Sequence, residues 1–294
     1  MEIETNPPFV PRNAHGDLAI AFHSRHVSLD GIDQDQLLSS SAPWDRFTGV
    51  LKSCASGDFS KLESLFQLLD QEDGYLLWRA GTNLVASAGS WEVVGRFVGH
   101  FEPFSAHEDA GEIVAAALGL SCDLRAVDLL IELHEASSDE DTRIEIEGEL
   151  SMLLEREEGV LWTGARPVDG ASQSAPDGLD RRTYFGHVRA LHQQLVSELS
   201  PAAKVFEGQI YDVIAIANRL RARLQQNPIS TERVLREKLI FEAATGIDCT
   251  AFFSEDRRLI PLAGIAIIDD FLDGDAAQRF SPGLRYFFGH PVPG

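Results

Sequence analysis

The sequence is poor in cysteine and has no long apolar run, and each absence excludes a class of protein. Only three of its 294 residues are cysteine, and Cys54, Cys122 and Cys249 lie far apart without a C-x-x-C pair. A disulfide framework is not expected, and a reducing cytoplasm fits this usage. The first residues, MEIETNPPFVPR, lack the apolar core of a signal peptide, and no apolar run approaches the about 18 residues of a membrane-spanning helix. We therefore expect a cytoplasmic protein without membrane contacts.

Basic residues are also few, because 25 lysines and arginines face 46 aspartates and glutamates, for a net charge of −21. Such a charge repels nucleic acid and attracts basic partners, although a generally acidic or halophilic protein is the alternative explanation. The one basic run, NRLRARL at 218–224, is explained by a solvated helix face. We expect no nucleic-acid ligand. The apolar fraction of 44% is sufficient for a core.

Motifs of catalysis are almost absent. There is no H-E-x-x-H, G-x-S-x-G or Walker sequence, so we expect no enzyme and no cofactor. The exception is the D-D-x-x-D spacing of Asp269, Asp270 and Asp273, which isoprenoid synthases use to hold magnesium against a diphosphate. Because no second metal motif follows, an acidic helix end is the preferred interpretation, with Arg279 or Arg285 offsetting the unfavourable helix dipole. A magnesium-dependent α-helical enzyme remains the remote alternative.

Helical periodicity is what the sequence does contain, and it repeats. Three segments begin at Phe59, Trp91 and Leu124, which are 32 and 33 residues apart. Their apolar residues coincide at four positions of one helix face. The intervening segments also align, at Ala80/Ile113/Ile146 and at Leu84/Ala117/Leu150. Helix–turn–helix units of this length predict an all-α, HEAT-like helical-repeat solenoid with a helical C-terminal part. A non-repetitive helix bundle is the alternative.

The predicted organisation has four parts: an irregular N-terminal arm at 1–40, the helical-repeat region at 41–162, a linker or loop at 163–182 and a helical C-terminal region at 183–294. In the last part, Pro201 is expected to open a helix that runs through 218–224, and almost no strand is expected. A further helix has Gly246 just after its end. The three aromatic residues at 286–288 are expected to cap the solenoid.

Acidic side chains concentrate in the third repeat unit. Between Glu132 and Glu158 eleven carboxylates face only Arg143 and Arg156, a local balance of −9. Like charges spaced four apart, such as Glu145 and Glu149, destabilise a helix, and a basic partner would relieve this repulsion. A solvated helix face is the alternative. The candidate partner-binding residues are Asp128, Glu132, Glu135, Asp139, Glu140, Asp141, Glu145 and Glu149.

Gly95 and Gly99 lie one turn apart in a predicted helix, where each costs about 1 kcal/mol relative to alanine. They indicate either close helix packing or room for a partner.

The C-terminal third resembles a known family. REKLIFEAATGIDCTAFF (236–253), IIDDFL (267–272) and FSPGLRYFFGHPVP (280–293) resemble bacterial HEAT-like-repeat proteins that accompany secreted polymorphic toxins. The resemblance implies an immunity protein that binds and neutralises a cognate toxin. A basic toxin would suit the acidic charge. A helical-repeat scaffold or regulator with another basic partner is the alternative.

Overall fold

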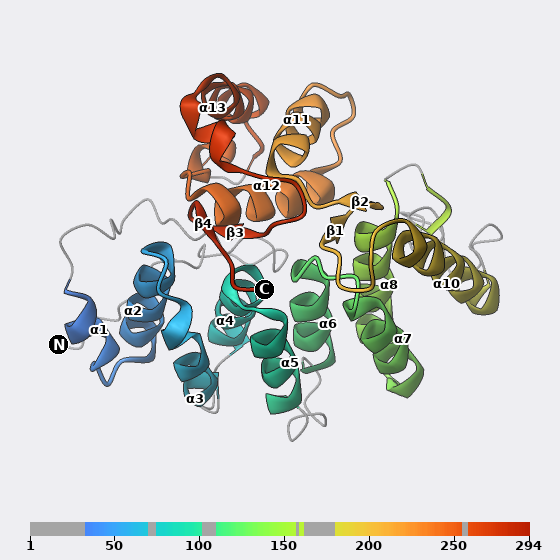
Figure 1. Ribbon diagram of the computed structural model, residues 1–294, viewed down its shortest axis with the longest axis horizontal. Helices are drawn as coiled ribbons and strands as arrows, with labels where there is room; N and C mark the ends of the chain where they lie inside the picture. Colours follow the sequence, from blue (N-terminus) through green and yellow to red (C-terminus); the bar gives the residue numbers. More distant parts are fainter. Residues whose placement is uncertain (1–32, 70–74, 102–109, 157–158, 162–179, 255–257) are drawn as a thin grey trace. The chain divides into compact units, whose positions relative to one another are not determined.

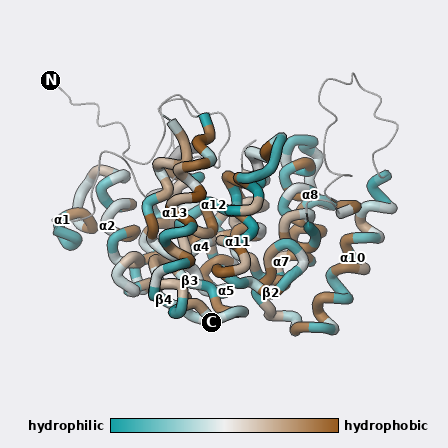
Figure 2. The backbone as a smooth tube through the Cα atoms, turned by 90° about the horizontal axis from the view of Figure 1, so that it is seen from above, coloured by the Kyte–Doolittle hydropathy of each residue, from teal (hydrophilic) through white to brown (hydrophobic). Residues whose placement is uncertain are grey.

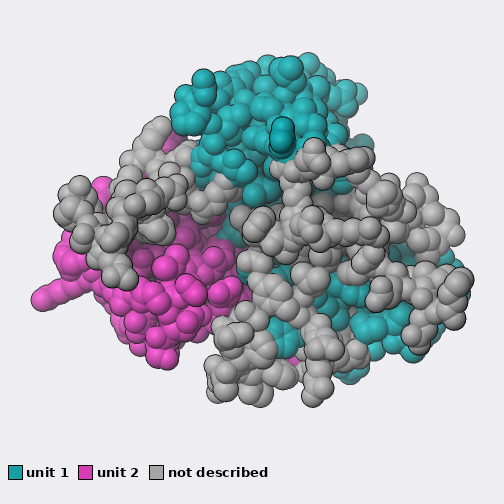
Figure 3. All heavy atoms as spheres, turned by 180° about the vertical axis from the view of Figure 1, so that it is seen from behind, with its two compact units in different colours: residues 1–90, 212–294 teal, residues 91–211 magenta. Residues whose placement is uncertain are grey.

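The computed structural model describes residues 33–69, 75–101, 110–156, 159–161, 180–254 and 258–294 (Figure 1). Within these residues the protein is all-α, as the sequence predicts, and its strands form only two short hairpins. No helix of the described ranges has the length and apolar character that crossing a bilayer requires. The chain divides into two compact units, which are coloured separately in Figure 3.

Unit 1 combines residues 1–90 with residues 212–294. Its elements are α1 (Gln34–Leu38), α2 (Pro43–Ala55), the 3-10 helix η2 (Phe59–Leu65), α3 (Phe66–Leu69), α4 (Tyr75–Ala88), α11 (Val213–Leu224), α12 (Thr231–Thr245), η4 (Thr250–Phe252), α13 (Pro261–Asp273), η5 (Asp275–Arg279), β3 (Tyr286–Phe287) and β4 (His290–Pro291).

Unit 2 contains residues 91–211. Its elements are α5 (Trp91–His100), α6 (Ala110–Leu120), α7 (Ala126–Ala136), α8 (Glu140–Leu154), α10 (Arg181–Glu198), β1 (Val205–Phe206) and β2 (Gln209–Ile210).

These units cut across the organisation predicted from the sequence. The described residues up to Ser90 pack with those from Asp212 onward, whereas boundaries were expected near residues 40, 162 and 182. Helix α1 lies inside the segment predicted to be irregular, where Asp33 caps it by accepting the amide of Asp35 at 3.0 Å. Helix α10 begins at Arg181, so its first two residues lie inside the predicted linker. Residues 1–32 and 162–179 lie outside the described residues.

The repeat positions in the second helix of each unit are buried as their pattern predicts. Ala80 and Leu84 of α4, Ile113 and Ala117 of α6, and Ile146 and Leu150 of α8 are all fully buried. The first copy departs from the pattern, because Phe59–Leu65 is a 3-10 helix rather than an α-helix. A continuous solenoid through both units stays a prediction.

Helix α6 forms the centre of unit 2. Nine of its eleven residues are buried, from Ala110 to Leu120. Helices α5, α7 and α8 all contact it, and α7 also contacts α8. Because α7 and α8 turn their apolar sides to α6, their polar sides point outward and form the surface considered below.

The segment after α10 folds into a hairpin, so the prediction of a helix opening at Pro201 is wrong. Strands β1 and β2 pair antiparallel, and α11 begins only at Val213, capped by Asp212. The turn residues Glu207 and Gly208 have φ of 52° and 66°. Their amides donate to the carbonyls of Met152 and Leu153 at 2.8 and 2.9 Å, which satisfies the orphan acceptors at the end of α8.

A second hairpin repeats this arrangement in unit 1. The turn between β3 and β4 places Phe288 and Gly289 at φ of 49° and 79°. Their amides donate to the carbonyls of Ala243 and Ala244, each at 2.7 Å, near the end of α12. Gly246 follows α12 with φ of 73°, as its predicted position after the helix requires.

Candidate functional site: the acidic face of α7 and α8

The turn between α7 and α8 places acidic residues where they stabilise α8. Asp139 is the N-cap, and its carboxylate accepts the amide of Thr142 at 2.7 Å. This hydrogen bond lowers the pKa of Asp139 below its ordinary value. Glu140 and Asp141 occupy the first turn, where negative charge interacts favourably with the helix dipole. Part of the acidic cluster is therefore explained by the stability of the helix itself.

Exposure separates the eight candidate carboxylates into three groups. Six are exposed and Glu145 is half-buried, whereas Glu149 is only 4% exposed. We define the acidic face as the seven that reach the surface: Asp128, Glu132, Glu135, Asp139, Glu140, Asp141 and Glu145.

Glu149 is not part of the acidic face, so its assignment to partner binding is corrected. Its carboxylate lies against Gly119 of α6, and a Cβ built on that glycine would be 1.7 Å from Glu149 Oε2. Glu149 was predicted to be exposed because its four-residue spacing from Glu145 suggested that both lie on one outer face of the helix. The helix instead turns this position toward α6, beside the fully buried Leu150.

Helix α10 supplies bases to the acidic face, which the sequence did not reveal. Arg181 Nη2 lies 2.6 Å from Glu140 Oε1, and this hydrogen bond lowers the pKa of Glu140. Two further contacts follow on the same helix. Arg189 Nη2 lies 3.0 Å from Glu135 Oε1, and His192 Nδ1 lies 3.5 Å from Asp128 Oδ1. Three carboxylates of the face thus already have basic neighbours within unit 2.

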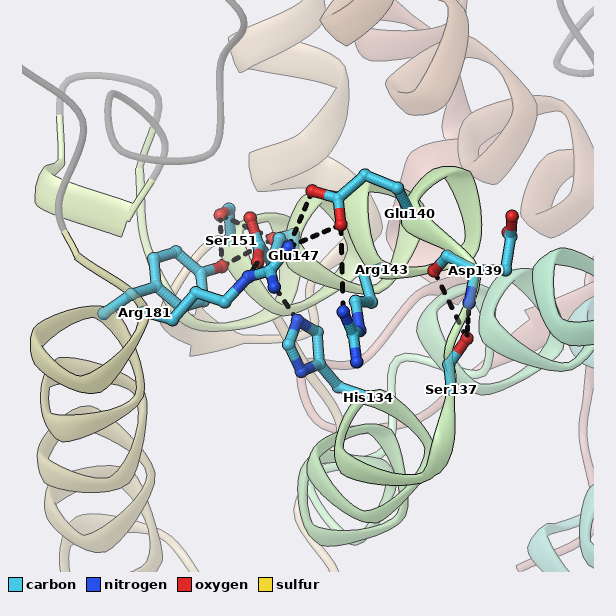
Figure 4. Close-up of polar contacts among 9 residues, drawn as sticks. His134, Ser137, Asp139, Glu140, Arg143, Glu147, Ser151 and Arg181 are labelled. Atoms are coloured by element: carbon cyan, nitrogen blue, oxygen red, sulfur yellow. Dashed lines mark hydrogen bonds and ion pairs between the residues drawn. The ribbon is translucent and has the colours of Figure 1, made fainter. Parts of the chain in front are cut away.

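A polar cluster joins the three helices where α10 begins. Figure 4 shows Arg181 reaching toward Glu140 and Glu147, with His134 of α7 contacting the same Glu147. His134 Nε2 lies 3.1 Å from Glu147 Oε1, and its ring packs edge-on against Phe185 at 4.5 Å. Burial lowers the pKa of His134 below its ordinary value, more than the neighbouring carboxylate raises it.

Tyr184 fixes the first turns of α10 to α8. Its hydroxyl donates to the Glu147 carbonyl at 2.7 Å and lies 3.1 Å from the Ser151 hydroxyl. Burial raises the pKa of this hydroxyl. The sequence feature that could have indicated these contacts is the spacing of Arg181, Arg189 and His192, which places all three on one side of an amphipathic helix. Spacing within a helix does not say which other helix it contacts.

One residue of the D-D-x-x-D motif, Asp269, takes part in a surface ion pair. Arg221 Nε lies 2.6 Å from Asp269 Oδ1, so α11 supplies the offsetting charge that was expected from Arg279 or Arg285. Arg285 is instead buried and donates to the carbonyls of Ala86 and Ser87, the latter at 2.8 Å. Among the described residues, no group of three or more His, Cys, Asp or Glu side chains is arranged to hold a metal ion.

The basic run at 218–224 is not a plain solvated face, which corrects the sequence interpretation. Arg223 is buried and donates to both carboxylate oxygens of Glu237, at 2.8 and 3.3 Å. Arg219 Nε lies 3.7 Å from the same carboxylate. A second buried pair on α12 joins Lys238 to Glu242 at 2.6 Å. Ion pairs of this kind cost about as much desolvation as they return in attraction, so they fix geometry more than they stabilise.

Gly95 and Gly99 of α5 are exposed, and a Cβ added to either would meet nothing within 4 Å. Close helix packing therefore does not explain them.

No family model, no curated protein and no solved structure matches the chain in the three comparisons made. Function is therefore inferred from the residues of the acidic face and from the resemblance of the C-terminal third.

Proposed function

We propose that the protein is a cytoplasmic immunity protein that binds a basic protein toxin through the acidic face and neutralises it by occupation, without catalysis. The observation that carries this proposal is the exposure of the face. Glu132, Asp139 and Asp141 point to the surface within one helix–turn–helix unit of a chain whose net charge is −21. A field of one sign speeds encounter with a partner of the opposite sign.

The chemistry of the face favours cationic groups. Carboxylates bind arginine through charge-assisted hydrogen bonds, and Arg181 Nη2 makes two of them within the chain, at 2.6 and 2.7 Å from the two carboxylate oxygens of Glu140. Toxins that cut or modify nucleic acid need basic residues around their active sites. An acidic surface can take the place of such a substrate, and the resemblance to immunity proteins supports this partner over another basic protein.

The proposal is tested with the protein encoded by the adjacent reading frame. Co-expression with the wild-type chain should restore growth that the neighbouring protein stops, and the two proteins should co-purify. The variant E132K/D141K should lose both effects. The control D270K/D273K changes the net charge equally at exposed positions of α13 and should keep both.

The role of Asp139 needs a conservative substitution because it also caps α8. Asp139→Asn removes the charge but keeps a capping oxygen, whereas Asp139→Ala also removes the cap at a cost of about 1 kcal/mol. Loss of toxin binding by Asp139→Asn would support a direct contact. Equal binding by E132K/D141K and D270K/D273K, or no binding by the wild type, would refute the proposal.

A further inference from the structure

Helix α10 places a basic stripe on the same surface that a basic partner would use. Arg181, Arg189 and His192 lie eight and three residues apart, so they share one side of the helix. They contact Glu140, Glu135 and Asp128, which are three of the seven carboxylates of the acidic face. All three carboxylates and both arginines are exposed. Exposed ion pairs of this kind contribute little to the stability of a helix, so cations of a partner can replace the arginines in them.

The apolar attachment of α10 is small for its length. Of its 18 residues only Tyr184, Phe185, Val188 and Leu195 are buried. Figure 2 shows hydrophilic and hydrophobic residues interspersed along the helix. Three of the four buried residues lie in its first half, where Tyr184 and Phe185 contact α8 and α7.

The second half of α10 leaves a hollow against α7. The hollow has a volume of about 490 Å³ and is lined by Asp128 of α7 and by His192 and Val196 of α10, among others. By contrast, two backbone hydrogen bonds fix the chain just beyond the C-terminal end of α10. Leu124 donates to Ala203 and Val205 donates to Cys122, at 2.9 and 2.7 Å.

We infer that α10 is an autoinhibitory cover that occupies part of the acidic face in the free protein and is displaced by the basic partner. This inference rests on the proposed function. Each exchanged carboxylate loses a cation of α10 and gains a cation of the partner, so the number of ion pairs is conserved. The cover also discriminates between partners. A weakly basic protein cannot replace the contacts of Arg181 and Arg189, whereas a strongly basic one can.

The experiment uses the full chain and a synthetic deca-arginine peptide as the probe. The variant R181A/R189A removes both arginine contacts and should bind the peptide several-fold more tightly than the wild type. The control R182A/R279A loses the same charge at exposed positions, so it isolates the cover from the net charge. It should bind more tightly than the wild type only to the small extent that its two lost charges predict. An affinity of R181A/R189A no higher than that of this control would overturn the inference.

Hydrogen–deuterium exchange provides a second readout that does not depend on affinity. Saturating peptide should speed amide exchange across 183–198 in the wild type. In the free protein, R181A/R189A should already show faster exchange there. The charge swap E135R/R189E keeps the net charge and forms the same pair in reverse. Amide exchange across α10 in this variant should therefore match that of the wild type. Exchange of α10 that is unchanged at saturation overturns the inference, even where the peptide binds.

Failure of the inference and failure of the proposed function give different results. Rescue of growth that depends on Glu132 and Asp141, together with unchanged exchange in α10, removes the cover but keeps the immunity function. Absence of peptide binding by every variant counts against both, because then the acidic face attracts no basic ligand.

Discussion

At the scale of the residue, the contact between Gly119 and Glu149 leaves little space for an added side chain. A Cβ at position 119 would lie 1.7 Å from Glu149 Oε2 and 2.3 Å from its carboxyl carbon. Glu149 is buried, so its side chain has little space to retreat. We expect Gly119→Ala to lower the free energy of unfolding by about 1–3 kcal/mol, as overpacking of a core does. Equilibrium urea unfolding measures this loss.

Gly95→Ala is the matched control, because a Cβ there meets nothing within 4 Å. Alanine is favoured over glycine inside a helix by about 0.5–1 kcal/mol, so this variant should be more stable than the wild type. A Gly119→Ala protein as stable as Gly95→Ala would show that the Glu149 side chain moves freely, and the description of a tight α6–α8 contact would be wrong.

His134 is expected to make the free energy of unfolding depend on pH, at pH values above those where carboxylates ordinarily titrate. Its folded pKa lies below the ordinary 6.5, since burial disfavours the imidazolium. Between the two values the unfolded chain binds more protons than the folded one, so the free energy of unfolding should fall as pH drops below about 6.5. Glu147, Arg143, Arg181 and Phe185 surround this ring.

The measurement compares urea unfolding of the wild type and His134→Gln between about pH 7 and 5, above the ordinary carboxylate range. The variant keeps a polar group beside Glu147 but does not titrate, so its stability should vary less over this window. If the two proteins lose stability in parallel, His134 is not the group responsible, and the pairing with Glu147 outweighs its burial.

At the scale of the element, the two hairpins offer a matched test of how turns cap helices. Gly208 and Gly289 both have positive φ, of 66° and 79°, which costs an alanine about 1–2 kcal/mol. A Cβ on Gly208 would also lie 2.5 Å from the Leu154 carbonyl oxygen, whereas one on Gly289 meets nothing within 4 Å. Gly208→Ala should therefore be the more destabilising variant in urea unfolding, by roughly a further 1–3 kcal/mol. Equal losses would mean that the β1–β2 turn stands away from α8.

Periodicity predicted the long helices but not these hairpins, and the reason is physical. The helix whose acidic end was expected at Asp269, Asp270 and Asp273 is α13, Pro261–Asp273, because Pro261 and Gly274 mark its ends and an apolar face runs between them. Strands of two residues show no alternation that a sequence pattern can detect. The shared signal was F-x-G, in Phe206–Gly208 and Phe287–Gly289, where glycine permits the turn.

At the scale of the whole molecule, charge could be predicted from the sequence but its pairing could not. The composition gives a net charge of −21, and the order of the residues shows that acidic ones concentrate in the segments that form α7 and α8. Which of them remain on the surface depends on contacts between distant segments. Glu140 contacts Arg181, 41 residues later, and Arg189 contacts Glu135 across 54. Such contacts follow from helix packing, and a single sequence carries no direct record of it.

Salt should act oppositely on the free protein and on its complex with a basic ligand. Raising NaCl from about 0.01 M to 0.15 M shortens the screening length from about 30 Å to 8 Å. Repulsion among 46 carboxylates then weakens, so the melting temperature of the free chain should rise. Over the same range the affinity for deca-arginine should fall, because attraction across the acidic face is screened too. A melting temperature that falls with salt would mean that surface pairs such as Arg181–Glu140 outweigh the repulsion, and α10 would then be too firmly held to be displaced.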